Sequence, residues 1–150
     1  MAEGISRTAR PALGIGGHPI YSALLPVSIT CFIGALVTDI VYSRAPDMMW
    51  LDFSSWLLLA GLIVGGVAGV VLIVELLRGR ARGNQGFQAH ALFFLAAWVT
   101  EVFNSFIHAR DGWTAVVPAG LVLSALAVVF SLLAGWFWQS ASRIHTGDLR

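Results

Sequence analysis

Charged side chains are scarce in this sequence. Asp, Glu, Lys and Arg together make up 11% of its 150 residues, whereas soluble domains carry about 25%. None of the nine basic residues is Lys, and the arginines are spread along connections and tails instead of forming the basic patch that a nucleic-acid partner requires. Because 57% of the residues are hydrophobic, a soluble globule of this size could not bury its apolar surface. The composition excludes a soluble nucleic-acid-binding domain and indicates an integral membrane protein.

Cysteine and catalytic motifs are equally rare. The single cysteine, Cys31, excludes an intrachain disulfide and falls inside an apolar run, where it is expected to pack as a small hydrophobe. Gly14, Gly16 and Gly17 precede no Lys and no strand-to-helix turn, so they do not predict a phosphate-binding loop. The tail at 1–18 lacks the apolar region of a cleavable signal, so the first apolar run is expected to remain as a span. The sequence carries no motif of a hydrolase or nucleotide-dependent enzyme.

Long apolar runs are what the sequence has in abundance. Four of them are long enough to cross a bilayer, which takes about 20 residues each; they cover 19–42, 53–77, 87–109 and 116–140. Four strands could not close a barrel, so the runs are predicted to be helices, and short connections make neighbours antiparallel. The sequence predicts an all-α fold, a single transmembrane four-helix up-down-up-down bundle flanked by tails at 1–18 and 141–150.

Arginine is distributed unevenly between the two sides of this bundle. The two tails and the connection at 78–82 hold seven of the nine arginines, while the other two connections hold Arg44 and Arg110. Because arginine next to a span favours the cytoplasm, both termini are expected to be cytoplasmic. Heavy use of Ala, Gly, Leu and Val, with Arg in place of Lys, is typical of a GC-rich bacterial genome. The expected location is the bacterial inner, or cytoplasmic, membrane.

Small residues recur at helical spacing in two of the runs. One stripe consists of Gly61, Gly65 and Gly69, and the other of Gly120, Ser124, Ala127, Ser131 and Gly135. Such stripes let helices approach closely where no hydrophobic effect drives them together. They are expected to be packing surfaces, either inside the bundle or between two copies in a homo-oligomer.

Three acidic residues lie within the spans. A charge at the bilayer centre costs about 2.5–3.5 kcal/mol, so each acid is a candidate functional residue. Asp39 is expected near the outer end of the first span, where an Arg or a water molecule is an ordinary partner. Glu75 is expected near the inner end of the second span, three residues before Arg78, at the spacing of a helical ion pair. Glu101 lies deeper, well inside the third span.

Glu101 belongs to a polar face of the third span. The members of this face are His90, Ala97, Glu101, Asn104 and His108. The two histidines align because they are about five whole helical turns apart. A matching face on the first span consists of Tyr21, Ser28 and Asp39. Polar faces in apolar spans point into the bundle, so Asp39, Glu101, Asn104 and His108 are predicted to form a polar core. Their side chains either hydrogen-bond between helices, at about 0.6 kcal/mol per bond, or serve a function.

His18 and His90 open the first and third spans from the same side. These spans are diagonal neighbours in an up-and-down bundle. Two histidines at similar depth on opposite walls have the geometry for bis-imidazole ligation of haem b, with Glu75 or Arg78 near the propionates. A divalent metal held by His18, His90 and Glu75 is the other chemical option. The haem hypothesis implies quinone or another redox partner as the electron source.

The residues that frame the spans carry a family resemblance. The first span opens with Gly17, His18, Pro19 and Ile20, and Asp39, Glu75, His90, Asn104 and Arg110 follow. This series resembles the domain-of-unknown-function family 2231, small four-helix bacterial membrane proteins with a Gly-His-Pro-Leu/Ile-His-Pro start. Tyr21 and Ser22 stand where that signature has its second His and Pro. The resemblance implies the four-helix fold and, because some members are joined to Rieske-type iron–sulfur domains, a redox setting.

Three functional hypotheses follow. The leading one is a small polytopic membrane protein without enzymatic activity, an accessory or assembly subunit of a larger membrane complex with a histidine-containing polar core. The first alternative is a b-type haem electron carrier with His18 and His90 as axial ligands. The second alternative is a proton or ion pathway through Asp39, Glu101 and Glu75.

Overall fold

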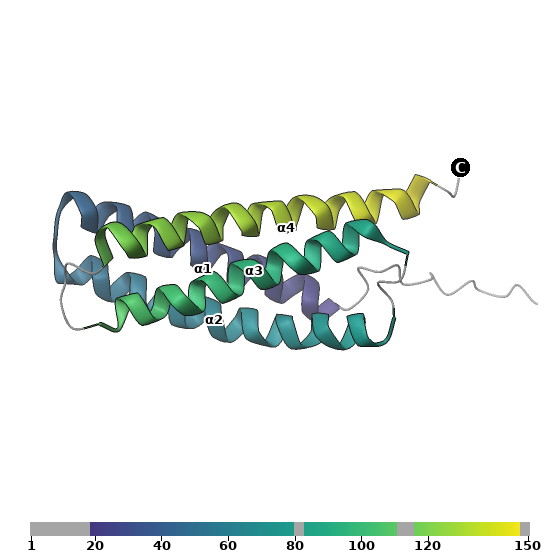
Figure 1. The fold of residues 1–150 in the computed structure, drawn as a ribbon, viewed down its shortest axis with the longest axis horizontal. Coiled ribbons are helices and arrows are strands. Elements are labelled where there is room, and N and C mark those ends of the chain that lie inside the picture. Colours follow the sequence, from purple (N-terminus) through teal and green to yellow (C-terminus); the bar gives the residue numbers. More distant parts are fainter. Residues whose placement is uncertain (1–18, 80–82, 111–115, 148–150) are drawn as a thin grey trace, which may run out of the picture.

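Four long helices make up the computed structural model, which describes residues 19–79, 83–110 and 116–147 (Figure 1). The helices are α1 (Pro19–Arg44), α2 (Met48–Leu77), α3 (Gln85–His108) and α4 (Leu121–Gly147), and a short irregular turn, η1 (Val116–Gly120), precedes α4. Each helix, with η1 counted as part of α4, is long and apolar enough to cross a membrane. The predicted all-α transmembrane bundle is confirmed.

The helix ends depend on local capping groups. α2 begins at Met48, earlier than the expected residue 53, because the side chain of Asp47 accepts a hydrogen bond from the backbone N–H of Met49 at 3.0 Å. Such a cap satisfies a backbone donor that the helix itself leaves free. Asn84 caps α3 in the same way. α4 continues to Gly147, past the expected end of the span at 140.

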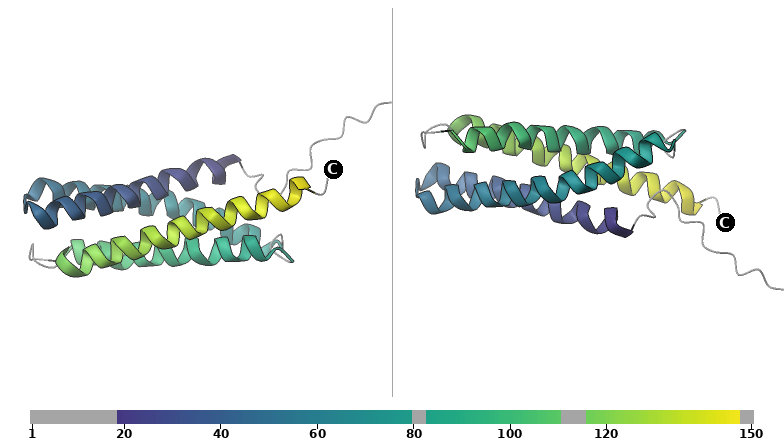
Figure 2. Two further views of the ribbon diagram at one scale, coloured as in Figure 1. Left: turned by 90° about the horizontal axis from the view of Figure 1, so that it is seen from above. Right: turned by 90° about the horizontal axis from the view of Figure 1, so that it is seen from below.

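The helices form two antiparallel hairpins that stack as two layers (Figure 2). α1 pairs with α2 and α3 with α4, while α1 also packs against α4 and α2 against α3. α1 and α3 are therefore diagonal neighbours that run in parallel. The start of α1, the end of α2, the start of α3 and the end of α4 lie at one end of the bundle, the terminal end (Figure 1). The opposite end is the hairpin end.

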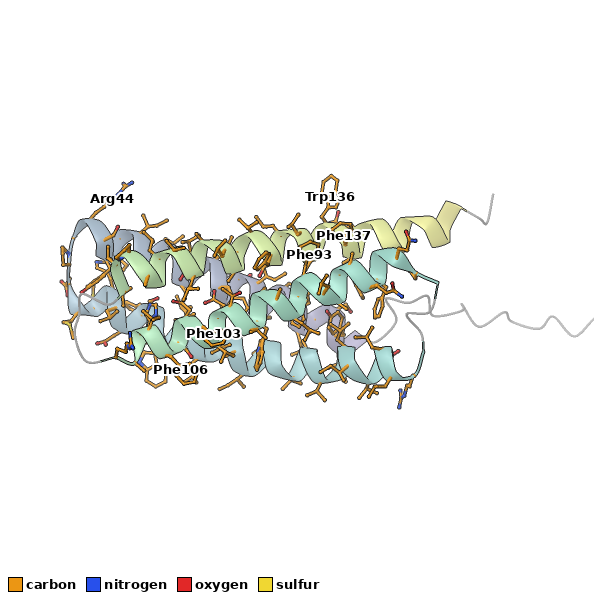
Figure 3. All side chains as sticks on the ribbon, in the orientation of Figure 1. Arg44, Phe93, Phe103, Phe106, Trp136 and Phe137 are labelled. Atoms are coloured by element: carbon orange, nitrogen blue, oxygen red, sulfur yellow. The ribbon has the colours of Figure 1, made fainter. Side chains whose placement is uncertain are left out.

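The outer surface of the bundle is apolar, whereas its interior mixes apolar and polar side chains. Trp56, Leu92 and Trp136 are among the large exposed side chains, and Trp136 points away from the bundle in Figure 3. Phe32 and Phe94 are fully buried, together with several serines and acids. An apolar exterior around a polar interior is the arrangement of a bundle surrounded by lipid.

The glycine stripe of α2 lies inside the bundle. Gly61 faces Phe32 of α1, and Gly65 faces Ser28 of α1 and Trp98 of α3. The hydroxyl of Ser28 donates a hydrogen bond to the backbone oxygen of Gly61 at 3.0 Å, which is a direct contact between α1 and α2. The stripe provides close helix packing, as expected.

The small-residue stripe of α4 also faces inward. Ser124, Ala127 and Ser131 are buried against the other helices. Gly135 differs, because a side chain added there would meet no atom within 4 Å. The stripe therefore packs inside one molecule along most of its length.

The substitution Gly61→Ala is expected to lower the free energy of unfolding by about 1–3 kcal/mol, the usual cost of overpacking a core. A methyl group at this position would lie 2.6 Å from Cε1 of Phe32, whose ring is fully buried. The measurement is reversible unfolding in mixed micelles. Gly135→Ala is the matched control, and equal stability of the two variants would contradict the close approach of α1 and α2.

Candidate functional site

A network of hydrogen-bonded side chains occupies the core toward the hairpin end. Its members are Asp39 from α1, Ser54 from α2, Glu101, Asn104 and His108 from α3, and Ser124 from α4. The side chain of His108 is 2% exposed, and the other five residues are completely buried. All four helices thus contribute to this Asp39 network.

The carboxylate of Asp39 is the centre of the network. Its Oδ1 accepts a hydrogen bond from the hydroxyl of Ser54 at 2.5 Å, and its Oδ2 accepts one from the hydroxyl of Ser124 at 2.5 Å. Nε2 of His108 lies 3.0 Å from Oδ1. Asp39 therefore joins α1 to each of the other three helices. Its partners among the described residues are two buried hydroxyls and a histidine.

Hydrogen-bond partners determine where the protons of His108 lie. Nδ1 is 3.0 Å from the backbone oxygen of Asn104, and a carbonyl oxygen can only accept, so Nδ1 carries a hydrogen. On the other side of the ring, Nε2 faces Oδ1 of Asp39 at 3.0 Å and the hydroxyl of Ser54 at 3.1 Å. Because two facing lone pairs would repel each other, we assign a proton to the contact between Nε2 and the carboxyl of Asp39. Whichever of the two atoms carries that proton, the His108 and Asp39 side chains together are electrically neutral.

Glu101 and Asn104 complete the network on α3. Nδ2 of Asn104 donates to Oε2 of Glu101 at 2.8 Å and to the hydroxyl of Ser124 at 2.7 Å. Two buried acceptors, Oε1 of Glu101 and Oδ1 of Asn104, have no hydrogen-bond partner among the described residues. Within the same ranges no basic side chain forms an ion pair with Glu101. Glu101 is a fully buried acid whose carboxyl group is only half satisfied.

A second group of side chains, the Tyr21–His90 cluster, lies toward the terminal end. The hydroxyl of Tyr21 is 2.5 Å from Nε2 of His90, and Nδ1 of His90 is 2.8 Å from the backbone oxygen of Ala134. Because that carbonyl only accepts, Nδ1 carries the hydrogen of the neutral ring, and Nε2 accepts a hydrogen bond from the hydroxyl of Tyr21. The rings of Trp138 and Phe94 pack on the imidazole, with centroids 4.9 and 6.3 Å away. His90 is thus surrounded by α1, α3 and α4.

The residues proposed from the sequence to hold haem or a metal are brought together only in part. His18 lies outside the described residues. Both ring nitrogens of His90 are hydrogen-bonded, so an ion bound at Nε2 would have to displace Tyr21. Glu75 pairs with the exposed Arg78 at 3.5 Å near the terminal end of α2, which is the expected ion pair. In the ranges that the structure describes, no group of three or more His, Cys, Asp and Glu side chains is arranged to hold a metal ion.

The four residues assigned to a polar core from the sequence do meet in one network. The prediction did not include the two serines of the network. Ser124 had been assigned to a small-residue stripe, and Ser54 lies near the start of α2, at the same depth in the bundle as Asp39. The prediction also missed that Tyr21 is the partner of His90. Glu75 lies toward the other end of the bundle from Asp39 and Glu101, so the three acids of the pathway hypothesis do not form one cluster.

Comparison with known proteins identifies a family. The model of the family described as predicted membrane protein, DUF2231, matches residues 17–147, a range that includes all four helices. No curated protein and no solved structure matches the chain.

Proposed function

Because this chain belongs to the DUF2231 family of predicted membrane proteins, we propose that it acts as a multi-pass membrane protein without enzymatic activity, an accessory or assembly subunit of a larger complex. The membrane is the bacterial inner membrane, and both termini face the cytoplasm. The arginine distribution supports this orientation, because Arg78 lies at the terminal end, where α1 begins and α4 ends.

The observation that carries this proposal is the use of polar side chains to join helices. Asp39 contacts side chains from α2, α3 and α4, and His90 contacts α1 and α4. Buried polar groups that satisfy one another in this way fix a single arrangement of the helices. A protein built like this acts through its shape and surface, as an accessory subunit does.

The accessory role predicts a stable partner in the membrane. The tagged protein, extracted in a mild detergent at its native expression level and analysed by chemical cross-linking and mass spectrometry, is expected to retain a defined membrane protein. Substitution of an exposed residue on the outer surface, such as Trp136→Ala, tests whether that part of the surface binds the partner. A strictly solitary monomer under these conditions would count against an accessory role.

The haem alternative is tested by one absorbance spectrum. The structure favours a preparation without a Soret band, because the nitrogen of His90 that would bind iron accepts a hydrogen bond from Tyr21. Protein purified from haem-replete cells is therefore expected to be colourless. A Soret band that is lost in both His18→Ala and His90→Ala would contradict this and support a b-type haem electron carrier.

A further inference from the structure

Two unpartnered acceptors belong to side chains of α3 that contact each other. Oε1 of Glu101 and Oδ1 of Asn104 are buried in the core and lack a hydrogen-bond donor among the described residues. Glu101 and Asn104 are in direct contact, because Nδ2 of Asn104 donates to the other carboxyl oxygen, Oε2, at 2.8 Å. An amide oxygen is always an acceptor, whereas a carboxyl oxygen becomes a donor when it is protonated. A single proton on Oε1 would therefore supply the donor that this pair of atoms lacks.

The charges of the surrounding side chains lead to the same requirement. The other ionisable groups of the network are Asp39 on α1 and His108 on α3, which lie 3.0 Å apart and are electrically neutral together. α2 and α4 contribute only the hydroxyls of Ser54 and Ser124. An ionised Glu101 would thus add one uncompensated negative charge to the interior of a membrane protein, where unpaired charges are strongly disfavoured. A proton bound at Glu101 removes that charge.

We propose that Glu101 is a proton-binding site, which holds an exchangeable proton on Oε1 with Oδ1 of Asn104 as its hydrogen-bond acceptor. The occupied site is neutral and fully hydrogen-bonded, and the empty site carries a negative charge. This inference does not depend on the accessory role, because the site is formed by residues of this chain alone.

The site is connected to the interhelical contacts of Asp39. Asn104 touches both Glu101 and Ser124, and the hydroxyl of Ser124 donates to Asp39. Loss of the proton from Glu101 draws the amide of Asn104 toward the new charge, so it weakens the bond from the same Nδ2 to Ser124. Protonation of Glu101 therefore stabilises the packing of α3 against α4, and the site gives the bundle a response to pH.

Infrared difference spectroscopy of the full-length protein in liposomes tests the proposal. The wild type is expected to show the carbonyl stretch of a protonated carboxyl group in acidic buffer, shifted in deuterated buffer and lost as the pH is raised. The Glu101→Gln variant, which keeps the size of the side chain, is expected to lack this band. Asp52→Asn, at an exposed acid of α2, is expected to retain it, which shows that the loss is specific to Glu101.

The remaining outcomes would overturn the proposal. Absence of the band in the wild type at every pH would show that Glu101 stays ionised, and a band of constant intensity from acidic to alkaline buffer would show that Glu101 never releases its proton. Both results come from the wild type, so they do not depend on how well a variant folds. A band that disappears on addition of sodium chloride at constant pH, but not of potassium chloride, would identify the site as one for sodium ions.

Discussion

Replacement of Asp39 by Leu is expected to lower the free energy of unfolding by about 3–5 kcal/mol, the loss typical of removing one member of a buried charged pair. Three hydrogen bonds end at this carboxylate, and at about 0.6 kcal/mol each they account for roughly 2 kcal/mol. The rest arises because the buried ring of His108 loses its counter-charge. The measurement is the unfolding free energy in mixed micelles.

An acid on the surface provides the control for this substitution. Asp52 lies on α2 and is exposed, so Asp52→Ala is expected to change the stability by less than about 0.5 kcal/mol. In a double-mutant cycle, His108→Leu is expected to cost less in the Asp39→Leu background than in the wild type, with a coupling of about 1–3 kcal/mol. An Asp39→Leu variant as stable as Asp52→Ala would show that the network does not hold the helices together.

His90→Ala is expected to lower the free energy of unfolding by at least about 3 kcal/mol. The change opens a cavity between the rings of Trp138 and Phe94, and cavities left by large buried side chains cost about 3–5 kcal/mol when they do not collapse. It also leaves the buried hydroxyl of Tyr21 without its acceptor, a further penalty. Thermal unfolding in detergent, followed by circular dichroism, measures the loss.

Leu92→Ala is the matched control for His90→Ala, because Leu92 is on the same helix but faces outward. Its effect is expected to be small. Tyr21→Phe alone is expected to cost about 1–3 kcal/mol, since it leaves Nε2 of His90 unpartnered. The same change should cost much less in the His90→Ala background, where that acceptor is already absent. Additive effects of the two substitutions would contradict the hydrogen bond between these side chains.

The sequence was sufficient to predict which residues face the core. When a few polar residues share one face of an apolar transmembrane helix, that face is expected to point into the bundle and away from lipid. Glu101, Asn104 and His90 were placed inside on this ground, and all three are buried. The same periodicity placed Asp39 and Tyr21 on the inner face of α1. Helix number and pairing followed from the lengths of the runs and of the connections.

The partners of these residues could not be predicted in the same way. Whether Asp39 meets a serine, an arginine or water depends on the rotation and depth of neighbouring helices, which periodicity does not determine. Ser54 gave little signal, because a serine in a helix commonly bonds to its own backbone. The bond from Tyr21 to His90 depends on the crossing of α1 and α3, since 69 residues separate the two side chains in the sequence.

Two hydrogen bonds cross the core between α1 and α3, from Tyr21 to His90 and from Asp39 to His108, and each joins residues 69 positions apart. Because the offset is the same, the two bonds are separated by the same 18 residues on α1 and on α3. At 1.5 Å per residue the two parallel helices therefore stay in register over about 27 Å. α1 cannot slide along α3 by a turn without losing both bonds. The hydrocarbon core of a bilayer is about 30 Å thick. In a thinner membrane this protein is therefore expected to tilt as a rigid body, and in a thicker membrane the lipid is expected to adjust to its fixed length.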